Sequence, residues 1–420
     1  MYYFDHASTG VPKPQPVIDA VVHAMQHTAS SGRGAHDASL QASRVLLQTR
    51  SSLARLFGVS DPSRIAFTSN ATTALNTAIK GLLNPGDHVI TTQWEHNSVL
   101  RPLYEMGSLG VGMAIVPSDA NGCLDGVGIC DGLDAVVPLD ADTDAAAGEG
   151  MVQGAAQRRA SAPVADWAKY LRRNTKAVIC NHASNVTGNV LDLQAVSKFC
   201  QERDLLLIVD AAQTAGVFPI DVEALGIDVL CFTGHKSLMG PQGTGGIYVR
   251  KGLNCRPLQS GGSGIMTFNR LHPQMMPEAL EAGTQNIHGL AGLNAAVTYL
   301  FEQGMANLRQ REQALAWSFF EQVMSVPGVT VYGDFHSEQR APIVAVNIRD
   351  EHSGVVADVL AQTYSIFTRA GGHCAPLMHE ALGTRDRGVI RFSFSHLNHE
   401  EEIEHAVHAV SVLARDGLDS

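Results

Sequence analysis

Four short apolar runs, each followed at once by polar side chains, constrain the fold of this chain more than any other feature. The runs are residues 88–92, 177–180, 205–209 and 229–232. Stretches with helical spacing separate them. Short apolar runs joined by helical crossovers are typical of a mainly parallel sheet that is buried on both faces. The sequence therefore predicts an α/β fold built on such a sheet.

The polar residues that follow these runs should lie close together. The carboxyl ends of parallel strands meet at one edge of a sheet, and open α/β sheets bind their ligands beyond that edge. The polar clusters are residues 95–97, 181–185, 210–213 and 233–236. Each cluster alone is more often structural, but their shared position predicts one pocket.

Among the residues of these clusters, Lys236 is the strongest candidate for a catalytic residue. It follows the apolar run at 229–232 and precedes a glycine-rich stretch at 240–246. Burial favours the neutral amine, which is the form that makes a Schiff base with a carbonyl group. An ordinary solvated lysine in a surface turn is the alternative while this segment is taken by itself.

A group of hydroxyl residues that includes Thr72 and Thr73 stands before a predicted helix. The apolar residues from 74 to 83 have helical spacing, so residues 68–73 should lie at the start of that helix. Free N–H groups at a helix start attract a phosphate group. The cluster therefore predicts an anion site, although one hydroxyl residue in this place could serve only as a helix cap.

Composition excludes several classes of partner. The formal net charge of −11 argues against nucleic acids and anionic membranes. We find no apolar run long enough to cross a bilayer and no signal peptide, so the expected location is the cytoplasm. The 7 cysteines are scattered without a C-x-x-C pair. Neither a disulfide framework nor a metal site is therefore expected.

The chain divides into two predicted domains. A large domain spans residues 16–289, and residues 1–15 together with 290–420 form a smaller α+β domain. Residues 125–162 are rich in Gly, Ala and Asp and lack periodicity, which predicts an inserted surface segment. One long amphipathic helix is predicted from about residue 289 to residue 323.

Pyridoxal phosphate is a carbonyl cofactor that the predicted pocket would suit. It needs an anion site for its phosphate, a carboxylate to keep its pyridine nitrogen protonated, and a group against its ring. The residues that would meet these needs are Thr72, Thr73, Thr233 and His235 for the phosphate, Asp210 for the pyridine nitrogen, His96 for the ring face, and Asn185 and Gln213 for the phenolic oxygen. The imidazole of His96 could also shuttle protons, which makes it a catalytic candidate. Asp210 could instead be a helix cap, and His96 an ordinary core or surface histidine.

The chain resembles the class V (fold type I) pyridoxal-phosphate enzymes, and within them the cysteine desulfurase and selenocysteine lyase family. The resemblance is carried by residues 3–9, 32–36, 67–73, 95–97, 184–188, 209–213, 233–240, 281–284, 369–376 and 390–391. It implies a large seven-stranded domain and a small C-terminal domain. It also implies that Lys236 carries the cofactor, and that in a homodimer Thr284 reaches the phosphate in the other subunit.

The same resemblance implies that Cys374 selects the reaction. In the desulfurases a loop cysteine attacks the sulfur of substrate L-cysteine, which leaves alanine and a persulfide that is passed to a sulfur-acceptor protein. A thiol beside His373 in a glycine-rich loop would be a soft nucleophile with a lowered pKa. Arg391 would bind the substrate carboxylate bidentately, with Asn185 and Arg369 also around the substrate. Lys236 would move the proton of the α-carbon.

Some residues depart from the family pattern, and other functions remain open. His6 and Ser8 stand where Asn or Ser and Ala are more common, and Thr233 stands where Ser is common. The alternatives are a selenocysteine lyase, a class V aminotransferase, which has no need of Cys374, and a non-catalytic scaffold that binds a sulfur carrier. The acceptor could serve iron–sulfur cluster assembly or another sulfur pathway.

Overall fold

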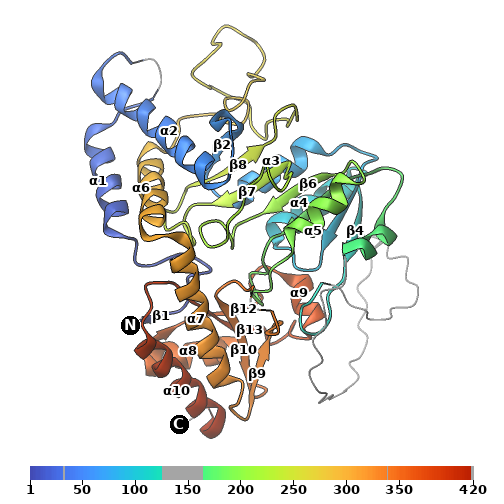
Figure 1. Ribbon diagram of the computed structural model, residues 1–420, viewed down its shortest axis with the longest axis vertical. Helices are drawn as coiled ribbons and strands as arrows, with labels where there is room; N and C mark the ends of the chain where they lie inside the picture. The colour runs from blue at the N-terminus through green and yellow to red at the C-terminus, as the bar shows by residue number, and fades with distance from the viewer. Residues whose placement is uncertain (32–33, 125–163, 338, 418–420) are drawn as a thin grey trace.

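The computed structural model describes residues 1–31, 34–124, 164–337 and 339–417. In Figure 1 a large α/β layer lies above a smaller one, and the chain begins and ends beside the smaller layer. The insertion predicted at 125–162 lies outside the described residues. No helix in the described part is long and apolar enough to cross a membrane.

In the described part of the chain, seven strands form the large sheet, as expected. Their order is β2 (Ile65–Thr68), β8 (Gly245–Val249), β7 (Val229–Thr233), β6 (Leu206–Asp210), β5 (Thr175–Asn181), β3 (His88–Thr92) and β4 (Gly112–Val116). The pairs from β7 to β4 are parallel, and β8 is antiparallel to both of its neighbours. The prediction of a mainly parallel sheet is confirmed. The four apolar runs are β3, β5, β6 and β7, which lie side by side.

Helices cover both faces of this sheet because its strands are apolar on both sides. One face packs against α2 (Asp37–Leu56), α5 (Leu193–Gln201) and α6 (Ile287–Gln303). The helix α1 (Gln15–His27) packs against α6. The other face of the sheet packs against α3 (Ala71–Leu82) and α4 (Asn97–Ser108). Successive strand residues point to opposite faces. In β5, accordingly, Val178 joins the first core and Ile179 the second.

The single helix predicted at 289–323 is two helices, α6 and α7 (Met305–Val323). Gly304 separates them with a φ of 78°. This left-handed conformation favours glycine, which has no Cβ to clash with the following carbonyl. The residues of α6 pack in the core of the large sheet, and those of α7 pack in the core of the small sheet from Leu315 on, while Met305 and Leu308 at its start still pack against the large core. We propose that the two domains divide near Gly304 rather than at residue 289.

The smaller layer is an antiparallel sheet with helices on it. The strand order is β12 (Arg369–Gly371), β13 (Val389–Ser393), β10 (Ile343–Ile348) and β9 (Val329–Tyr332). The helices α7, α8 (Ser353–Tyr364) and α10 (Glu400–Asp416) pack around it. Near the start of the chain, β1 (Tyr2–Tyr3) pairs in parallel with β11 (Ile366–Phe367), so the first residues join the smaller layer.

Candidate active site

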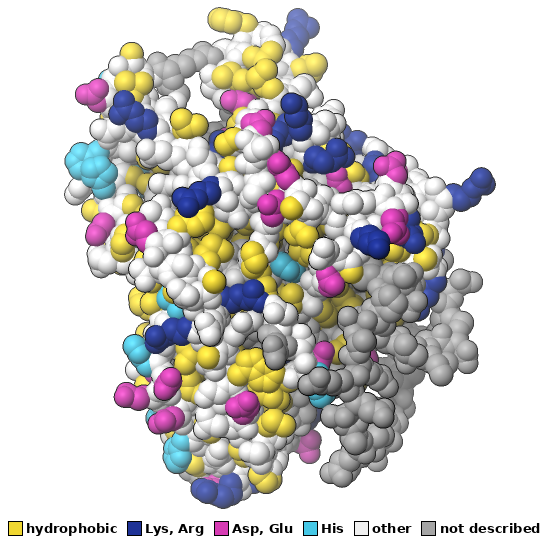
Figure 2. Space-filling model, viewed as in Figure 1, with side chains coloured by type: hydrophobic (Ala, Val, Ile, Leu, Met, Phe, Trp, Pro, Cys, Tyr) yellow, Lys and Arg dark blue, Asp and Glu magenta, His cyan; other side chains and the backbone are white. Residues whose placement is uncertain are grey.

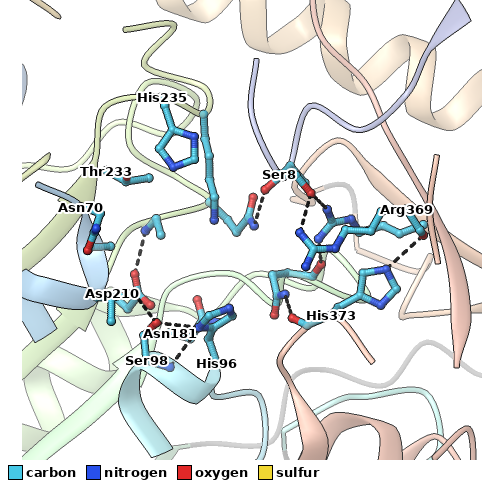
Figure 3. Close-up of a pocket in the computed structure, with 18 residues that line it drawn as sticks. Ser8, Asn70, His96, Ser98, Asn181, Asp210, Thr233, His235, Arg369 and His373 are labelled. Carbon is cyan, nitrogen blue, oxygen red and sulfur yellow. Dashed lines mark hydrogen bonds between the residues drawn. The ribbon is translucent and has the colours of Figure 1, made fainter. Parts of the chain in front are cut away.

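The carboxyl ends of β3, β5, β6 and β7 border a pocket of about 740 Å³, including its open mouth. Residues of the smaller layer and of the N-terminal segment close its other side (Figure 3). The predicted site residues that line it are Thr72, His96, Asn185, Asp210, Gln213, Thr233, His235, Lys236, Arg369 and Arg391. The structure therefore brings together most of the residues that were selected from strand ends and motifs.

Lys236 lies in the turn after β7, and this turn is held from outside by the N-terminal segment. The carbonyl of His235 accepts hydrogen bonds from the Gly10 N–H at 2.9 Å, the Lys13 Nζ at 2.8 Å and the Thr9 hydroxyl at 3.2 Å. Burial lowers the pKa of Lys236 to about 8. About a tenth of the amine is therefore neutral at pH 7, far more than for a solvated lysine, and the neutral amine is the form that makes a Schiff base.

Asp210 ends β6 and is 4% exposed. Its Oδ1 accepts a hydrogen bond from the Ala212 N–H at 2.9 Å. Burial raises the pKa of Asp210, while this N–H and the charge of Lys236 act in the opposite direction. A cation placed against this carboxylate would relieve the cost of burying its charge. A protonated pyridine nitrogen fits that requirement.

His96 is fixed as a neutral ring with a defined tautomer. Its Nδ1 accepts the Ser98 N–H at 3.0 Å, so the ring carries its proton on Nε2. The Ser98 hydroxyl lies 2.9 Å from the same Nδ1 and 2.7 Å from the Thr72 hydroxyl. Burial, assisted by the charge of Lys236, lowers the pKa of His96 to about 4. The ring therefore stays uncharged at physiological pH and suits contact with a flat cofactor.

An anion would find donors at the start of α3. Asn70 caps this helix, its Oδ1 accepting the Thr73 N–H at 2.9 Å, and it lines the pocket beside Thr72 and Thr233. His235 is beside them, and its buried Nδ1 has no hydrogen-bond partner among the described residues. An unpaired buried polar atom on a residue that lines the same pocket as a helix start fits a bound phosphate oxygen.

Thr73 and Thr284 are not in this pocket. Both line a second cavity, where the Thr73 hydroxyl lies 3.0 Å from the Ser69 hydroxyl. Thr72 and Thr73 face different cavities within one chain because neighbouring residues of a helix point about 100° apart. The phosphate contact of Thr73 stays a prediction. Thr284 was expected to act in the other subunit, so its place in its own chain leaves that prediction untested.

Arg391 is a buried arginine at the wall of the pocket, 2% exposed. Its Nη1 donates to the Asn185 carbonyl at 2.9 Å, and its Nη2 donates to Asp5 Oδ1 at 2.9 Å and to Ser8 Oγ at 2.7 Å. Its buried Nε has no partner among the described residues. Burial lowers the pKa of Arg391, and Asp5 opposes that effect. Asp5 and Ser8 received no site role from the sequence.

Cys374 is exposed and lies in the loop that follows β12. The loop is anchored to the large layer, since the Cys374 carbonyl accepts the Asn97 N–H at 2.7 Å and the His373 carbonyl accepts Asn185 Nδ2 at 2.8 Å. His373 and Cys374 both have positive φ, 48° and 56°. Such a conformation costs of order 1 kcal/mol per residue, so these anchors are needed to hold it.

The imidazole of His373 brings no positive charge to this loop. The residue is buried, its Nε2 lies 3.1 Å from the Arg369 carbonyl, and burial lowers its pKa well below the ordinary value. The ring is therefore neutral at physiological pH. The prediction that His373 activates Cys374 electrostatically is wrong, because a histidine folded under the loop brings no positive charge to the thiol.

The sequence matches the model of the aminotransferase class-V family over residues 2–138 and 151–405. The chain belongs to this family. It is 30% identical over 409 residues to a probable cysteine desulfurase from Methanothermobacter thermautotrophicus, covering 96% of this chain and 92% of the relative. The fold is that of the fold type I pyridoxal-phosphate enzymes, as predicted.

Solved structures agree with this placement. An apo cysteine desulfurase from Thermococcus onnurineus matches with a TM-score of 0.83 and 28% identity, covering 98% of this chain and 94% of that one. A cysteine desulfurase from Escherichia coli in an S-sulfonic acid form matches with a TM-score of 0.78 and 26% identity, covering 97% and 93%. The chain is thus similar over almost its whole length to cysteine desulfurases.

Proposed function

We propose that this protein is a pyridoxal-phosphate-dependent cysteine desulfurase. It would convert L-cysteine and the Cys374 thiol to L-alanine and a Cys374 persulfide. The carbon–sulfur bond of the substrate breaks, a sulfur–sulfur bond forms, and a proton replaces sulfur on the β-carbon. The observation that carries this proposal is a desulfurase-like set of lysine, carboxylate and arginine in one pocket, with the exposed Cys374 next in the chain to His373, which lines that pocket.

Each residue has a part that follows from its surroundings. Bound pyridoxal phosphate would supply an electron sink next to the α-carbon of the amino acid. Asp210 would pair with its pyridine nitrogen, and Thr72, Thr233 and His235 would hold its phosphate beside the start of α3. His96 would lie against the ring with its proton on Nε2.

The remaining residues would act on the substrate. Arg391 would bind the carboxylate of cysteine, and Arg369 and Asn185 would lie beside it. Lys236, with a pKa of about 8, would take the α-proton and return it. Cys374 would attack the substrate sulfur from the loop. Because this cysteine is exposed, its persulfide would be open to the thiol of a sulfur-acceptor protein, for iron–sulfur cluster assembly or another use in the cytoplasm.

A homodimer is part of this proposal. Residues 258–284 project from the large layer (Figure 1), and hydrophobic side chains gather at their tip (Figure 2), including Phe268, which is 100% exposed. At the base, the Glu281 carboxylate pairs with Arg50 at 2.8 and 3.1 Å. A second copy would cover the apolar tip and receive Thr284 in its own pocket. Light scattering should give twice the chain mass, and Phe268→Asp should lower it.

Assays of L-alanine and sulfide released from L-cysteine with a thiol reductant test the activity. Wild type should release both, and Cys374→Ala should release no sulfide while keeping the visible absorbance of the bound cofactor. Cys123→Ala, at a part-buried cysteine outside the loop that follows β12, is the matched control and should behave as wild type. Full activity of Cys374→Ala would overturn the mechanism and favour a selenocysteine lyase.

A further inference from the structure

A serine hydroxyl joins the two arginines of the pocket. Ser8 Oγ accepts a hydrogen bond from Arg391 Nη2 at 2.7 Å and another from Arg369 Nη1 at 2.9 Å. It donates its own hydrogen to Asp5 Oδ1 at 2.7 Å. A hydroxyl has one hydrogen and two lone pairs, so these three bonds use its full capacity. Figure 3 shows Ser8 beside Arg369 at the wall of the pocket.

The two arginines depend on Ser8 to different degrees. Arg391 is buried and is also held by the Asp5 carboxylate and the Asn185 carbonyl. Arg369 is exposed, and within the described residues its guanidinium has Ser8 as its one hydrogen-bond partner and no carboxylate within ion-pair distance. Loss of the hydroxyl would leave Arg391 in place and release Arg369.

The hydrogen bonds from Arg369 and Arg391 to Ser8 also reduce the repulsion between the two arginines. The positive charge of Arg369 contributes to lowering the pKa of Arg391, so the two guanidinium groups repel each other. An oxygen that accepts from both lowers that repulsion and keeps the exposed side chain turned inward. Without it, solvent and side-chain entropy would both favour an Arg369 that points away from the pocket.

We propose that Ser8 is a positioning residue for substrate binding, which holds Arg369 over the pocket so that two arginines face the substrate carboxylate. This inference rests on the proposed function, because it assumes an amino-acid substrate. Ser8 is one of the positions where the chain departs from the pattern of the family it resembles, in which Ala is more common.

Steady-state kinetics of Ser8→Ala test the inference. The KM for L-cysteine should rise about tenfold, the effect of losing one hydrogen bond to a charged group, with kcat changed less than about twofold. Ser8→Thr keeps the hydroxyl and should restore most of the affinity. An unchanged KM in a folded Ser8→Ala variant that keeps its bound cofactor would overturn the inference.

A double-mutant cycle shows whether Ser8 acts through Arg369. In an Arg369→Ala background, Ser8→Ala should change the KM by less than about twofold, since no guanidinium is left to hold. Equal tenfold effects in both backgrounds would show that Ser8 contributes in another way and would contradict the proposal.

Two inhibitors separate this inference from the proposed function. The inhibition constant of 3-mercaptopropionate, which has a carboxylate, should rise with Ser8→Ala by the same factor as the KM. That of ethanethiol, which has none, should stay constant; an equal rise for both would overturn the carboxylate role of Ser8. If wild type releases no alanine from cysteine, the proposed function fails first. If wild type is active and only these shifts are missing, the inference about Ser8 alone fails.

Discussion

The floor and the wall of the pocket are built in opposite ways. The floor consists of side chains at the ends of β3, β6 and β7, among them the nearly fully buried Asp210. The wall consists of the N-terminal segment, β12 with the loop that follows it, and β13. Arg369 in β12 and Cys374 in the loop are exposed. A rigid parallel sheet thus positions the groups that would hold a cofactor. The N-terminal segment and the smaller layer carry the groups that would meet substrate and acceptor, of which Arg391 is buried and Arg369 and Cys374 are exposed.

This difference has a physical reason. A cofactor that remains bound benefits from groups that need no reorganisation, and strand ends provide them. A persulfide that must reach another protein needs an exposed position. Each of the following experiments probes one side of this division.

The largest effect is expected at the floor, from Asp210→Asn. Without the carboxylate, the pyridine nitrogen loses its charge partner, and kcat should fall by about 100-fold or more, as for loss of one electrostatic stabiliser. Asp192→Asn is the matched control, because Asp192 also caps backbone N–H groups but sits at the exposed start of α5. Equal activity of the two variants would mean that Asp210 serves only as a cap.

Asp5→Asn should break the fixed part of the wall. It removes the carboxylate that pairs with buried Arg391, so the free energy of unfolding should fall by about 3 kcal/mol. The KM for cysteine should rise as well. Ser8→Ala, which removes no charge, should lower the unfolding free energy by only about 1 kcal/mol. Denaturant titration of both variants measures the two losses of unfolding free energy. Equal losses would mean that Arg391 does not depend on the Asp5 carboxylate more than on Ser8.

The pKa of Lys236 makes cofactor uptake depend on pH. The neutral amine reacts, and its fraction rises as the pH passes through the pKa of about 8. The rate at which apo protein gains visible absorbance with pyridoxal phosphate should therefore rise about fivefold to tenfold between about pH 7 and 9. Stopped-flow absorbance would follow it. A rate that keeps rising steeply above about pH 10 would indicate a solvated lysine and a less buried floor.

The smallest effect is expected from Ser98→Ala. The hydroxyl touches His96 Nδ1, but the backbone N–H of residue 98 also binds that nitrogen and remains in the variant. The ring should keep its place and tautomer, so kcat should fall less than about threefold. A much larger loss in steady-state assays would show that the floor depends on side chains as well as on the backbone.

The sequence predicted the floor better than the wall. Apolar runs ending in polar residues are local patterns, and they led to His96, Asp210 and Lys236. Thr73 lines a different cavity from Thr72 because helical rotation separates neighbours. Asp5 and Ser8 were missed because their partner Arg391 is more than 380 residues away along the chain, and no local pattern reports such a contact.

Two further features were not predicted from the sequence. They are the break between α6 and α7 and the neutral state of His373. Gly304 carried the signal for the break, but glycine is tolerated within helices, so its positive φ could not be read from spacing. The burial of His373 depends on its packing against His379 and the Arg369 carbonyl, which only the folded chain brings together.

The pairing of β1 with β11 has a consequence for the order in which the molecule is completed during synthesis. Tyr2 lies opposite Ile366, and Asp5 bridges to Ser393. The strands of the large sheet end at residue 249, so that sheet can assemble on the ribosome while the partners of Asp5 are still unmade. The cofactor-binding side of the pocket would then be folded in the nascent chain before the substrate-binding side is synthesised. Pyridoxal phosphate would be able to bind early, whereas catalysis would require the last part of the chain to pair with the first residues.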